Sequence, residues 1–307
     1  MKKDYSVIIP VYNGELTIEK LFIEILNFFN QTDYSFEVII VFDCGKDNSW
    51  KIIKQLKDGN PLIITAIKLT KNYGQHNAII AGINHANSNF IITMDEDLQH
   101  NPNDIKLLIN KQKENDYDIV YGKYNELKHS FFRNLTSKIM KKLLIVSIPD
   151  LNKDYSAYRI IKTSIAKEIL KMNNSYTFID GYFSWVTTNT TSVLVSHNKR
   201  YAGKSAYNFK KLFNHSINIF FTFSNIPIKV LTISSLLILV SSLVYTIYLL
   251  VRKLVYNDLI EGYASTMIVL GFGIGLIIFG LGIIGEYIHR INLKTTKRPN
   301  YLEKKVL

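Results

Sequence analysis

The chain contains a single cysteine, Cys44, among its 307 residues. One thiol cannot form a disulfide within the chain, which excludes the cross-linked framework of small secreted domains and suits a reducing compartment. The sequence also lacks internal repeats and low-complexity tracts. No signal peptide is expected, because Met1-Lys2-Lys3-Asp4 leads directly into a strand-like run.

Nucleic-acid signatures are absent as well. The formal net charge is +12, but no helix-turn-helix, zinc or RNA-binding motif accompanies it. The basic residues cluster instead at the outer ends of two long apolar runs, where lysine and arginine can face anionic lipid. We predict a membrane, and no nucleic acid, as the partner of this charge.

Two runs of the sequence, residues 230–251 and 262–285, contain no charged residue. Each is long enough to cross a hydrocarbon core of about 30 Å as a helix. Basic residues flank the pair at its outer ends: Lys210, Lys211 and Lys229 before it, and Arg290, Lys294, Lys297, Arg298, Lys304 and Lys305 after it. By the positive-inside rule we predict a two-helix transmembrane hairpin in the inner (cytoplasmic) membrane, with both termini in the cytoplasm.

The first part of the chain alternates between strand-like and helix-like periods. Apolar runs predict strands at 5–11, 36–42, 63–69, 90–94 and 118–122, and amphipathic stretches predict helices at 15–29, 47–56, 75–86 and 103–114. Such alternation favours an α/β fold with a mostly parallel sheet and flanking helices.

Polar side chains follow the predicted strands, and Tyr12, Asn13, Asp43, Asn72 and Asp95 all fall at strand ends. Ligands of open α/β sheets bind outside the carboxyl ends of the strands, so this convergence predicts a nucleotide site. The alternative is that Asn and Asp simply favour turns. That alternative explains each residue singly better than it explains all of them together.

The fourth predicted strand ends in Asp95-Glu96-Asp97, and Gln99 follows. In extended structure Asp95, Asp97 and Gln99 would point to one side. Mg²⁺ and Mn²⁺ prefer such oxygen ligands and commonly combine one or two carboxylates with substrate phosphates. The alternative is an acidic turn before the helix that Asn101-Pro102 is expected to cap.

The later segments divide the chain into four parts. We expect a cytoplasmic domain at 1–206, a juxtamembrane amphipathic helix at 207–227, two transmembrane helices within 228–290 and a basic cytoplasmic tail at 291–307. A further amphipathic helix is predicted at 131–144. The mixture of Phe, Leu and Lys at 209–223 is typical of a helix that lies in a membrane interface.

Six motifs together resemble family-2 glycosyltransferases. Four are shared widely in that family: Ser6 to Asn13, Asp43 with Asp47-Asn48-Ser49, Asn72 to Gln75, and Met94 to Gln99. Two are narrower and resemble its polyprenyl-phosphate branch, which includes dolichol-phosphate mannose synthase and bacterial undecaprenyl-phosphate glycosyltransferases: Arg200 to Asn208, and Gly285 to Ile288 followed by Arg290 and Arg298-Pro299. The resemblance extends over nearly the whole chain.

This resemblance implies a nucleotide-sugar-binding domain of the GT-A type and a set of site residues. The implied donor-binding residues are Pro10, Tyr12, Asn13, Asp43, Asn72, Asp95 and Glu96, with Asp43 on the base. The implied ligands of Mg²⁺ or Mn²⁺ are Asp95, Asp97 and Gln99. Phe42 departs from the family, which often has an acidic or amide residue there, so the nucleotide (UDP or GDP) is left open.

A lipid phosphate acceptor is already largely ionised at pH 7 and needs cationic positioning more than a base. The cationic candidates are Lys123, Arg133, Arg200 and Lys204, and guanidinium groups are preferred because they bind phosphate oxygens bidentately. Asp97, Asp154 and Arg200 form the predicted catalytic set, with Asp154 as a base or an orienter of the acceptor. A surface charge, for the lysines, and a turn aspartate, for Asp154, are the competing interpretations.

The expected function is inverting, metal-dependent transfer of one sugar from a nucleotide donor to a polyprenyl (undecaprenyl) phosphate, which feeds cell-surface glycan modification. The alternatives are a transferase that extends a lipid-linked glycan and a non-catalytic nucleotide-sugar-binding subunit. The absence of a Gln-x-x-Arg-Trp element counts against a processive synthase. A stripe of Gly271, Gly275 and Gly282 suggests close helix packing, within the hairpin or in a homo-oligomer.

Overall fold

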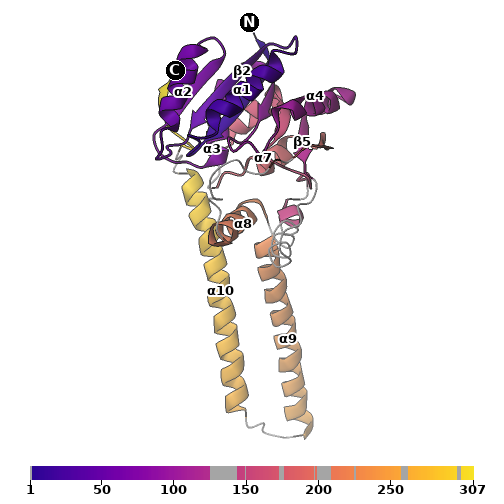
Figure 1. Cartoon of the computed structure of the whole chain (residues 1–307). Coiled ribbons are helices and arrows are strands. Elements are labelled where there is room, and N and C mark those ends of the chain that lie inside the picture. Colours follow the sequence, from indigo (N-terminus) through magenta and orange to yellow (C-terminus); the bar gives the residue numbers. More distant parts are fainter. Residues whose placement is uncertain are drawn as a thin grey trace.

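A computed structural model describes most of the chain as an α/β domain from which two long helices extend (Figure 1). The described residues are 2–124, 144–148, 150–172, 176–196, 198, 209–224, 226–256, 262–295 and 299–307. Nearly all of the predicted helix at 131–144 lies outside them, as do the predicted acceptor residues Arg133, Arg200 and Lys204.

The domain is built on one eight-stranded sheet in the order β7-β5-β6-β4-β1-β2-β3-β8. Its strands are β1 Lys3–Val11, β2 Phe36–Phe42, β3 Ile64–Leu69, β4 Ser88–Thr93, β5 Ile119–Lys123, β6 Arg159–Lys162, β7 Thr190–Leu194 and β8 Glu303–Val306. Strands β3, β2, β1 and β4 form a parallel block, and β7 also runs parallel to β5. The predicted α/β fold with a mostly parallel sheet is confirmed.

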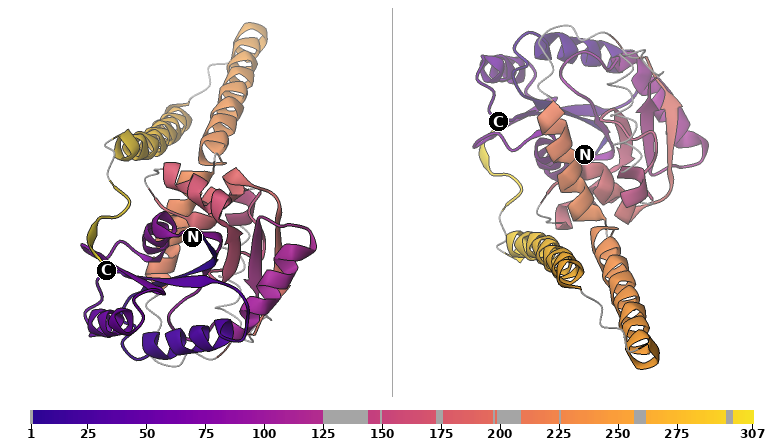
Figure 2. Two further views of the ribbon diagram at one scale, coloured as in Figure 1. Left: turned by 90° about the horizontal axis from the view of Figure 1, so that it is seen from above. Right: turned by 90° about the horizontal axis from the view of Figure 1, so that it is seen from below.

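Helices cover both faces of the sheet, as the views along the long axis show (Figure 2). Side chains alternate along β1, so Val7 and Ile9 pack into one core while Ile8 packs into the other. The first core receives α1 Ile18–Phe29, α2 Ser49–Gly59 and α4 Ile105–Glu114; the second receives α3 Gln75–His85, α6 Thr163–Glu168 and α7 Ile179–Val186. Burial of both sheet faces explains the continuous apolar runs in these strands.

The predicted helix start at Asn101-Pro102 is present. The side chain of Asn101 accepts a hydrogen bond from the Asn103 N–H at 3.1 Å, and Pro102 opens the 3₁₀ turn Pro102–Asp104 that leads into α4. The acidic turn and the helix cap therefore coexist, because the capping side chain is Asn101 and not Asp95 or Asp97.

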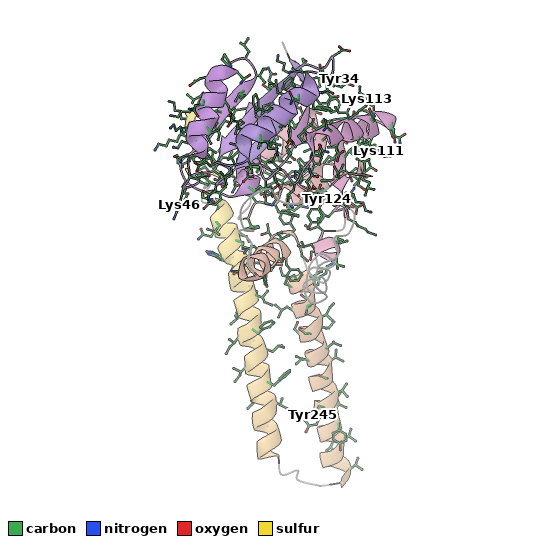
Figure 3. The ribbon with its side chains drawn as sticks, viewed as in Figure 1. Tyr34, Lys46, Lys111, Lys113, Tyr124 and Tyr245 are labelled. Atoms are coloured by element: carbon green, nitrogen blue, oxygen red, sulfur yellow. The ribbon has the colours of Figure 1, made fainter. Side chains whose placement is uncertain are left out.

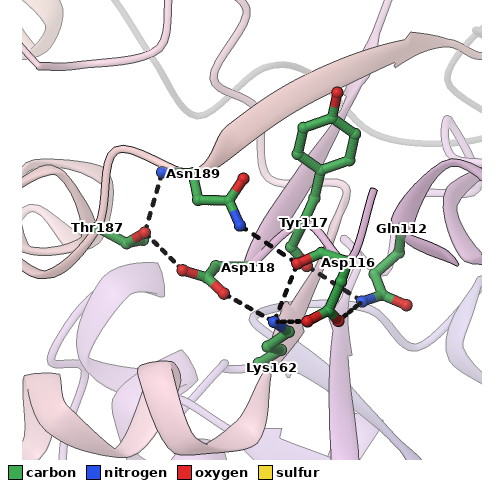
Figure 4. A network of polar contacts seen from close by, with 7 residues as sticks. All are labelled: Gln112, Asp116, Tyr117, Asp118, Lys162, Thr187 and Asn189. Atoms are coloured by element: carbon green, nitrogen blue, oxygen red, sulfur yellow. Dashed lines mark hydrogen bonds and ion pairs between the residues drawn. The ribbon is translucent and has the colours of Figure 1, made fainter. Parts of the chain in front are cut away.

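A polar network joins β5, β6 and the residues that lead into β7 (Figure 4). The ammonium of Lys162 lies 2.9 Å from a carboxylate oxygen of Asp116 and 2.9 Å from one of Asp118. Burial alone would lower the pKa of Lys162, but the hydrogen bonds and charges of the two aspartates outweigh it and raise that pKa. Asp118 also accepts a hydrogen bond from Thr187 at 2.6 Å, so the network fixes the strands that bring Lys123 to the site.

The C-terminal segment contains a strand that the sequence did not predict. Residues 291–307 are predicted as a basic tail, and within them Glu303–Val306 is the edge strand β8, antiparallel to β3. The backbone groups of Ala66 and Leu307 exchange hydrogen bonds at 3.1 and 2.9 Å, and His85 meets Glu303 at 2.8 Å. The chain therefore ends inside the same sheet in which it begins.

Between β7 and β8 the described chain forms three helices outside the α/β domain: α8 Phe209–Phe223, α9 Ile226–Tyr256 and α10 Tyr263–Thr295. The predicted helix at 209–223 and both predicted spans fall within them. One segment of the described chain, Phe272–Leu293 in α10, is long and apolar enough to cross a bilayer. A second is counted only if the end of α8 and the start of α9, bent by 69°, are taken together.

Gly280 lies at the contact between the two long helices, where a Cβ atom would be 3.1 Å from Leu231 of α9. A Cβ atom on Gly275 or Gly282 would meet no atom within 4 Å. Of the two predicted alternatives for these two glycines, close packing within the hairpin is therefore not observed among the described residues, and packing in an oligomer stays a prediction.

Candidate active site

Hydrogen bonds join the four loops at the carboxyl ends of the parallel strands into a ring. Asn13, after β1, accepts a hydrogen bond from the Lys46 N–H at 2.8 Å, which links the loops after β1 and β2. Asp43, after β2, accepts a hydrogen bond from the loop after β3. Gln75, after β3, donates a hydrogen bond to Asp95, after β4. Glu96, in the same loop as Asp95, accepts the Tyr12 N–H of the loop after β1 and so completes the ring. The predicted strand-end residues are thus brought together at one site.

The position of this ring matches the change in strand order. The chain runs β1-β2-β3 in one direction across the sheet and then places β4 on the other side of β1. Ligands of open α/β sheets bind at such a switch point, outside the carboxyl ends of the strands. Tyr12 and Asp95 lie on the loops after β1 and β4 at this point, and Tyr12 is 39% exposed.

Asp43 holds the loop that follows β3. Its buried carboxylate accepts hydrogen bonds from the Tyr73 and Gly74 N–H groups at 2.7 and 2.8 Å. Burial raises the pKa of Asp43, and these two hydrogen bonds oppose that shift. Gly74 has a φ of 87°, a conformation that favours glycine, so the turn before α3 depends on that residue. Contact of Asp43 with a nucleotide base stays a prediction.

Residues 95–98 form a turn, which corrects the expectation of extended structure there. Strand β4 ends at Thr93, and Leu98 has a φ of 62°. An Asx-type bond closes the turn, because the carboxylate of Asp97 accepts the Gln99 N–H at 3.1 Å. The alternation argument for Asp95, Asp97 and Gln99 is therefore wrong in its geometry. The turn instead holds its carboxylates at the ring of loops, where Asp95 accepts a hydrogen bond from Gln75 and Glu96 accepts one from the Tyr12 N–H.

The negative charge of this turn contributes to a raised pKa of Glu96. Burial, followed by the negative charges of Asp95 and then Asp97, raises the pKa of Glu96 to about 8. Three carboxylates therefore share one small volume. No cluster of three or more His, Cys, Asp or Glu side chains placed to hold a metal occurs among the described residues. Two carboxylates still fit Mg²⁺ or Mn²⁺, which completes its shell with water and substrate phosphates.

Gln99 connects this turn to the segment before Arg200. Its backbone oxygen accepts the Asn198 N–H at 3.0 Å, and its side-chain amide lies 3.5 Å from the Asn198 carbonyl oxygen. The predicted metal-binding turn and the start of the predicted acceptor segment are therefore adjacent.

His100 is a site residue that the sequence did not reveal. It is buried, its Nδ1 accepts the Asp95 N–H at 3.0 Å, and its ring stacks on Tyr158 at 5.0 Å and on Tyr124 at 5.9 Å. Burial, and then the charges of Asp95 and Asp97, raise the pKa of Tyr124. A lone histidine five residues after an aspartate carries no signal for this arrangement.

A buried ion pair holds the end of strand β4, which leads into the same turn. The guanidinium of Arg159 contacts the carboxylate of Asp180, and its Nε donates to Thr93 at 3.1 Å. Thr93 is the last residue of β4, so this pair fixes the strand that leads to Asp95. Burial raises the pKa of Asp180, although Arg159 opposes the shift.

Two residues predicted for the acceptor side form an ion pair. The Lys123 ammonium lies 3.2 Å from a carboxylate oxygen of Asp154, which also accepts a hydrogen bond from Ser192 at 2.9 Å. The Lys123 side chain is 51% exposed, so it faces solvent at the end of β5. Asn72 is also exposed at its strand end, whereas Pro10 is buried inside β1 and outside the ring.

The site lies at the end of the domain that faces the long helices (Figure 3). Lys46 and Tyr124 both lie at this end, close to the level of α8, whereas Tyr34 lies at the opposite end of the domain. A ligand at this site is therefore held on the side of the domain toward α8, α9 and α10.

The chain matches two families in succession. Residues 6–170 match glycosyl transferase family 2, and residues 226–291 match the GtrB C-terminal hairpin. The first match covers the ring of loops, Asp95, Asp97 and the ion pair of Lys123 with Asp154. The second covers α9 and most of α10.

Relatives match this chain over nearly its whole length and nearly all of their own. An undecaprenyl-phosphate 4-deoxy-4-formamido-L-arabinose transferase of Photorhabdus laumondii is 32% identical over 99% of this chain and 94% of its own length. A prophage bactoprenol glucosyl transferase homolog of Escherichia coli is 27% identical over 98% of both chains. The fold is similar to that of glucosyl-3-phosphoglycerate synthase from Mycobacterium tuberculosis, solved with Mn²⁺, UDP-glucose and phosphoglyceric acid: the TM-score is 0.51 and the identity 15%, over 72% of this chain and 78% of that one. The chain belongs to glycosyl transferase family 2 and is a glycosyltransferase.

Proposed function

We propose that the protein transfers one sugar from a nucleotide-sugar donor to a polyprenyl phosphate at the cytoplasmic face of the inner membrane, for modification of cell-surface glycans. The observation that carries the proposal is the match to polyprenyl-phosphate sugar transferases over nearly the whole chain, helices included. The direction of the site toward α8–α10 supports it, because a lipid phosphate would arrive from that side.

The donor half of the site is the ring of loops. Tyr12, Asn13 and Asn72 border the space for the nucleoside, and Asp95, Asp97 and Gln99 would hold a divalent cation with the diphosphate. When bound, Mg²⁺ or Mn²⁺ stabilises the charge on the leaving diphosphate as a Lewis acid. His100 and the Arg159–Asp180 pair keep the carboxylates in place.

The acceptor half requires positive charge more than a base. A phosphate monoester has a second pKa near about 6 and is already ionised at pH 7. Its oxygen forms the new bond to the anomeric carbon while the bond to the diphosphate oxygen breaks, and attack from the face opposite the leaving group inverts the configuration. Lys123, with Arg133, Arg200 and Lys204, supplies the cationic contacts. Asp154 orients Lys123, since its carboxylate already accepts from that ammonium and from Ser192.

A donor screen in proteoliposomes tests the proposal. Labelled UDP- and GDP-sugars are incubated with the full-length protein and undecaprenyl phosphate, and the lipid product is identified by mass spectrometry and its anomeric configuration by NMR. We expect one sugar per lipid from one donor. Absence of labelled lipid with every donor, while the protein stays folded, would refute the proposal.

The same assay separates the alternative of glycan extension. A lipid that already carries a sugar replaces undecaprenyl phosphate as acceptor, with the productive donor unchanged. Transfer only to the glycosylated lipid would favour a glycan-extending enzyme. Transfer only to the phosphate supports the proposed function.

A further inference from the structure

Trp185 is an exposed aromatic residue on the catalytic domain itself. It lies at the end of α7, and 52% of the residue is exposed. Its neighbours on α7 are buried, including Tyr182 at 0%. A tryptophan that leaves half of its large apolar surface uncovered stands out from this core.

The ring of Trp185 lies next to the point where the chain enters α9. Its centroid is 4.8 Å from that of Phe223, the last residue of α8. Ser224, which follows, accepts a hydrogen bond from the Ile226 N–H at 3.1 Å, and Ile226 is the first residue of α9. One aromatic contact therefore separates Trp185 from the first turn of a long apolar helix.

The contact between α7 and α8 is close and leaves no freedom of position. A Cβ atom on Gly181 would lie 2.6 Å from the Phe223 ring, so only glycine permits this approach. Tyr182 packs on the same ring at 5.8 Å. The position of Trp185 relative to the start of α9 is thus fixed by packing.

We propose that Trp185 is a direct contact of the catalytic domain with the surface of the lipid bilayer. The proposal rests on the proposed function, because it places α9 and α10 in a membrane. Tryptophan is enriched where a membrane meets water, since its ring is apolar and its N–H is polar. Continuity with α9 identifies lipid as the occupant: Trp185 contacts Phe223, and the helix that starts three residues later exposes Ile228 at 42% and Val230 at 59%.

Such a contact sets the height of the domain above the membrane. The helices α9 and α10 tether the domain, but a tether alone permits it to tilt. A third point on α7 would hold the strand-end site at a constant distance from the lipid phosphates.

The two tryptophans of the chain provide the test, because Trp50, at the start of α2, is partly buried and packs against the core of the domain, with its ring centroid 5.8 Å from that of Phe42. Full-length Trp50→Phe and Trp185→Phe variants each retain one tryptophan, which is excited selectively over the tyrosines, and serve as matched controls for each other. Both are reconstituted in phosphatidylcholine–phosphatidylglycerol vesicles with ordinary acyl chains or with chains brominated near the headgroup. We expect loss of most of the Trp185 emission in brominated vesicles and little loss of the Trp50 emission.

Two results would overturn the proposal: unquenched Trp185 emission and equal quenching of both variants. If the unquenched emission is also blue-shifted, protein rather than lipid covers the ring. Sugar transfer is measured in the same vesicles. Quenching without transfer would support the contact and contradict the proposed function, and transfer without quenching would do the reverse.

Discussion

Asp95 and Asp97 concentrate negative charge in a turn that the protein holds with a histidine, a glutamine and a buried ion pair. Like charges this close repel, and the charges of Asp95 and Asp97 add to the burial that raises the pKa of Glu96. A cation relieves that repulsion, which is why the residues fit a metal with a diphosphate better than they fit a purely structural turn.

We expect Asp97→Ala to lower kcat by at least about 100-fold, because Lewis-acid stabilisation of a leaving group contributes several kcal/mol. Chelation of divalent ions should have the same effect on the unchanged protein, and added Mg²⁺ or Mn²⁺ should restore activity. Asp58→Ala, at an exposed aspartate near the end of α2, is the matched control. Undiminished transfer by a folded Asp97→Ala protein would contradict the metal role.

Arg159 and Asp180 form a pair in which neither charge reaches solvent: their side chains are 1% and 5% exposed. Removal of one partner leaves a buried charge without compensation, so Asp180→Ala should lower the free energy of unfolding of the domain by about 3–5 kcal/mol. The double variant Arg159→Met with Asp180→Leu should lose clearly less, because two apolar groups replace the pair. Denaturant unfolding of the three proteins measures the difference; equal losses in both variants would show that the pair acts only through its volume.

Helix α8 is held between the domain and α10. The Arg290 side chain, 12% exposed, donates to the Thr222 hydroxyl at 2.8 Å and to the Asn218 side-chain oxygen at 3.2 Å, and it pairs with Glu286 at 2.6 Å. Its donors are therefore used by protein groups, which argues against Arg290 as a ligand of the lipid phosphate.

Arg290→Ala should separate α10 from α8 and change how the domain meets its lipid acceptor. Each hydrogen bond to a charged group contributes about 1.5–3 kcal/mol, so the unfolding temperature should fall by several degrees. We expect the KM for lipid to rise while the KM for nucleotide sugar stays constant. His289→Ala, at an exposed neighbour, is the control. Equal changes in both KM values would place the effect in the donor site instead.

Elements with strong local signals could be predicted from the sequence, and those that depend on distant partners could not. Strand β2 is observed at Phe36–Phe42, as predicted, because a run of apolar residues is bounded by polar turns. Strand β8 was missed because Glu303-Lys304-Lys305-Val306 is short and charged, and it is a strand only through pairing with β3. The ring of loops could be predicted because its residues follow the ends of parallel strands in the sequence. The hydrogen bond from the Asp95 N–H to His100 could not, because the spacing of the two residues gives no sign of it.

The whole molecule is a closed path in which the chain leaves the domain through α8 and α9 and returns through α10 to the edge of the sheet. Strand β8 pairs with β3, and β3 leads into the loop that Asp43 holds. One end of the helical part is therefore fixed to β3 through β8, and the other is fixed to α7 through the contact of Phe223 with Tyr182. The C-terminal residues contribute to the site through this pairing, although they lie outside it in sequence.

Truncation after Asn300 tests whether the tail acts as a strand or as a basic segment. If β8 acts by backbone pairing, its removal should expose the edge of β3, lower the unfolding temperature and raise the KM for nucleotide sugar, because the end of β3 loses its support. The double variant Lys304→Ala with Lys305→Ala removes two exposed charges and keeps the pairing. It should therefore resemble the unchanged protein in both measurements. If the tail instead acts through its charge, the double variant should match the truncated protein. Both should then bind anionic vesicles more weakly than the unchanged protein does. Thermal unfolding, donor kinetics and vesicle binding on the three proteins distinguish the two roles.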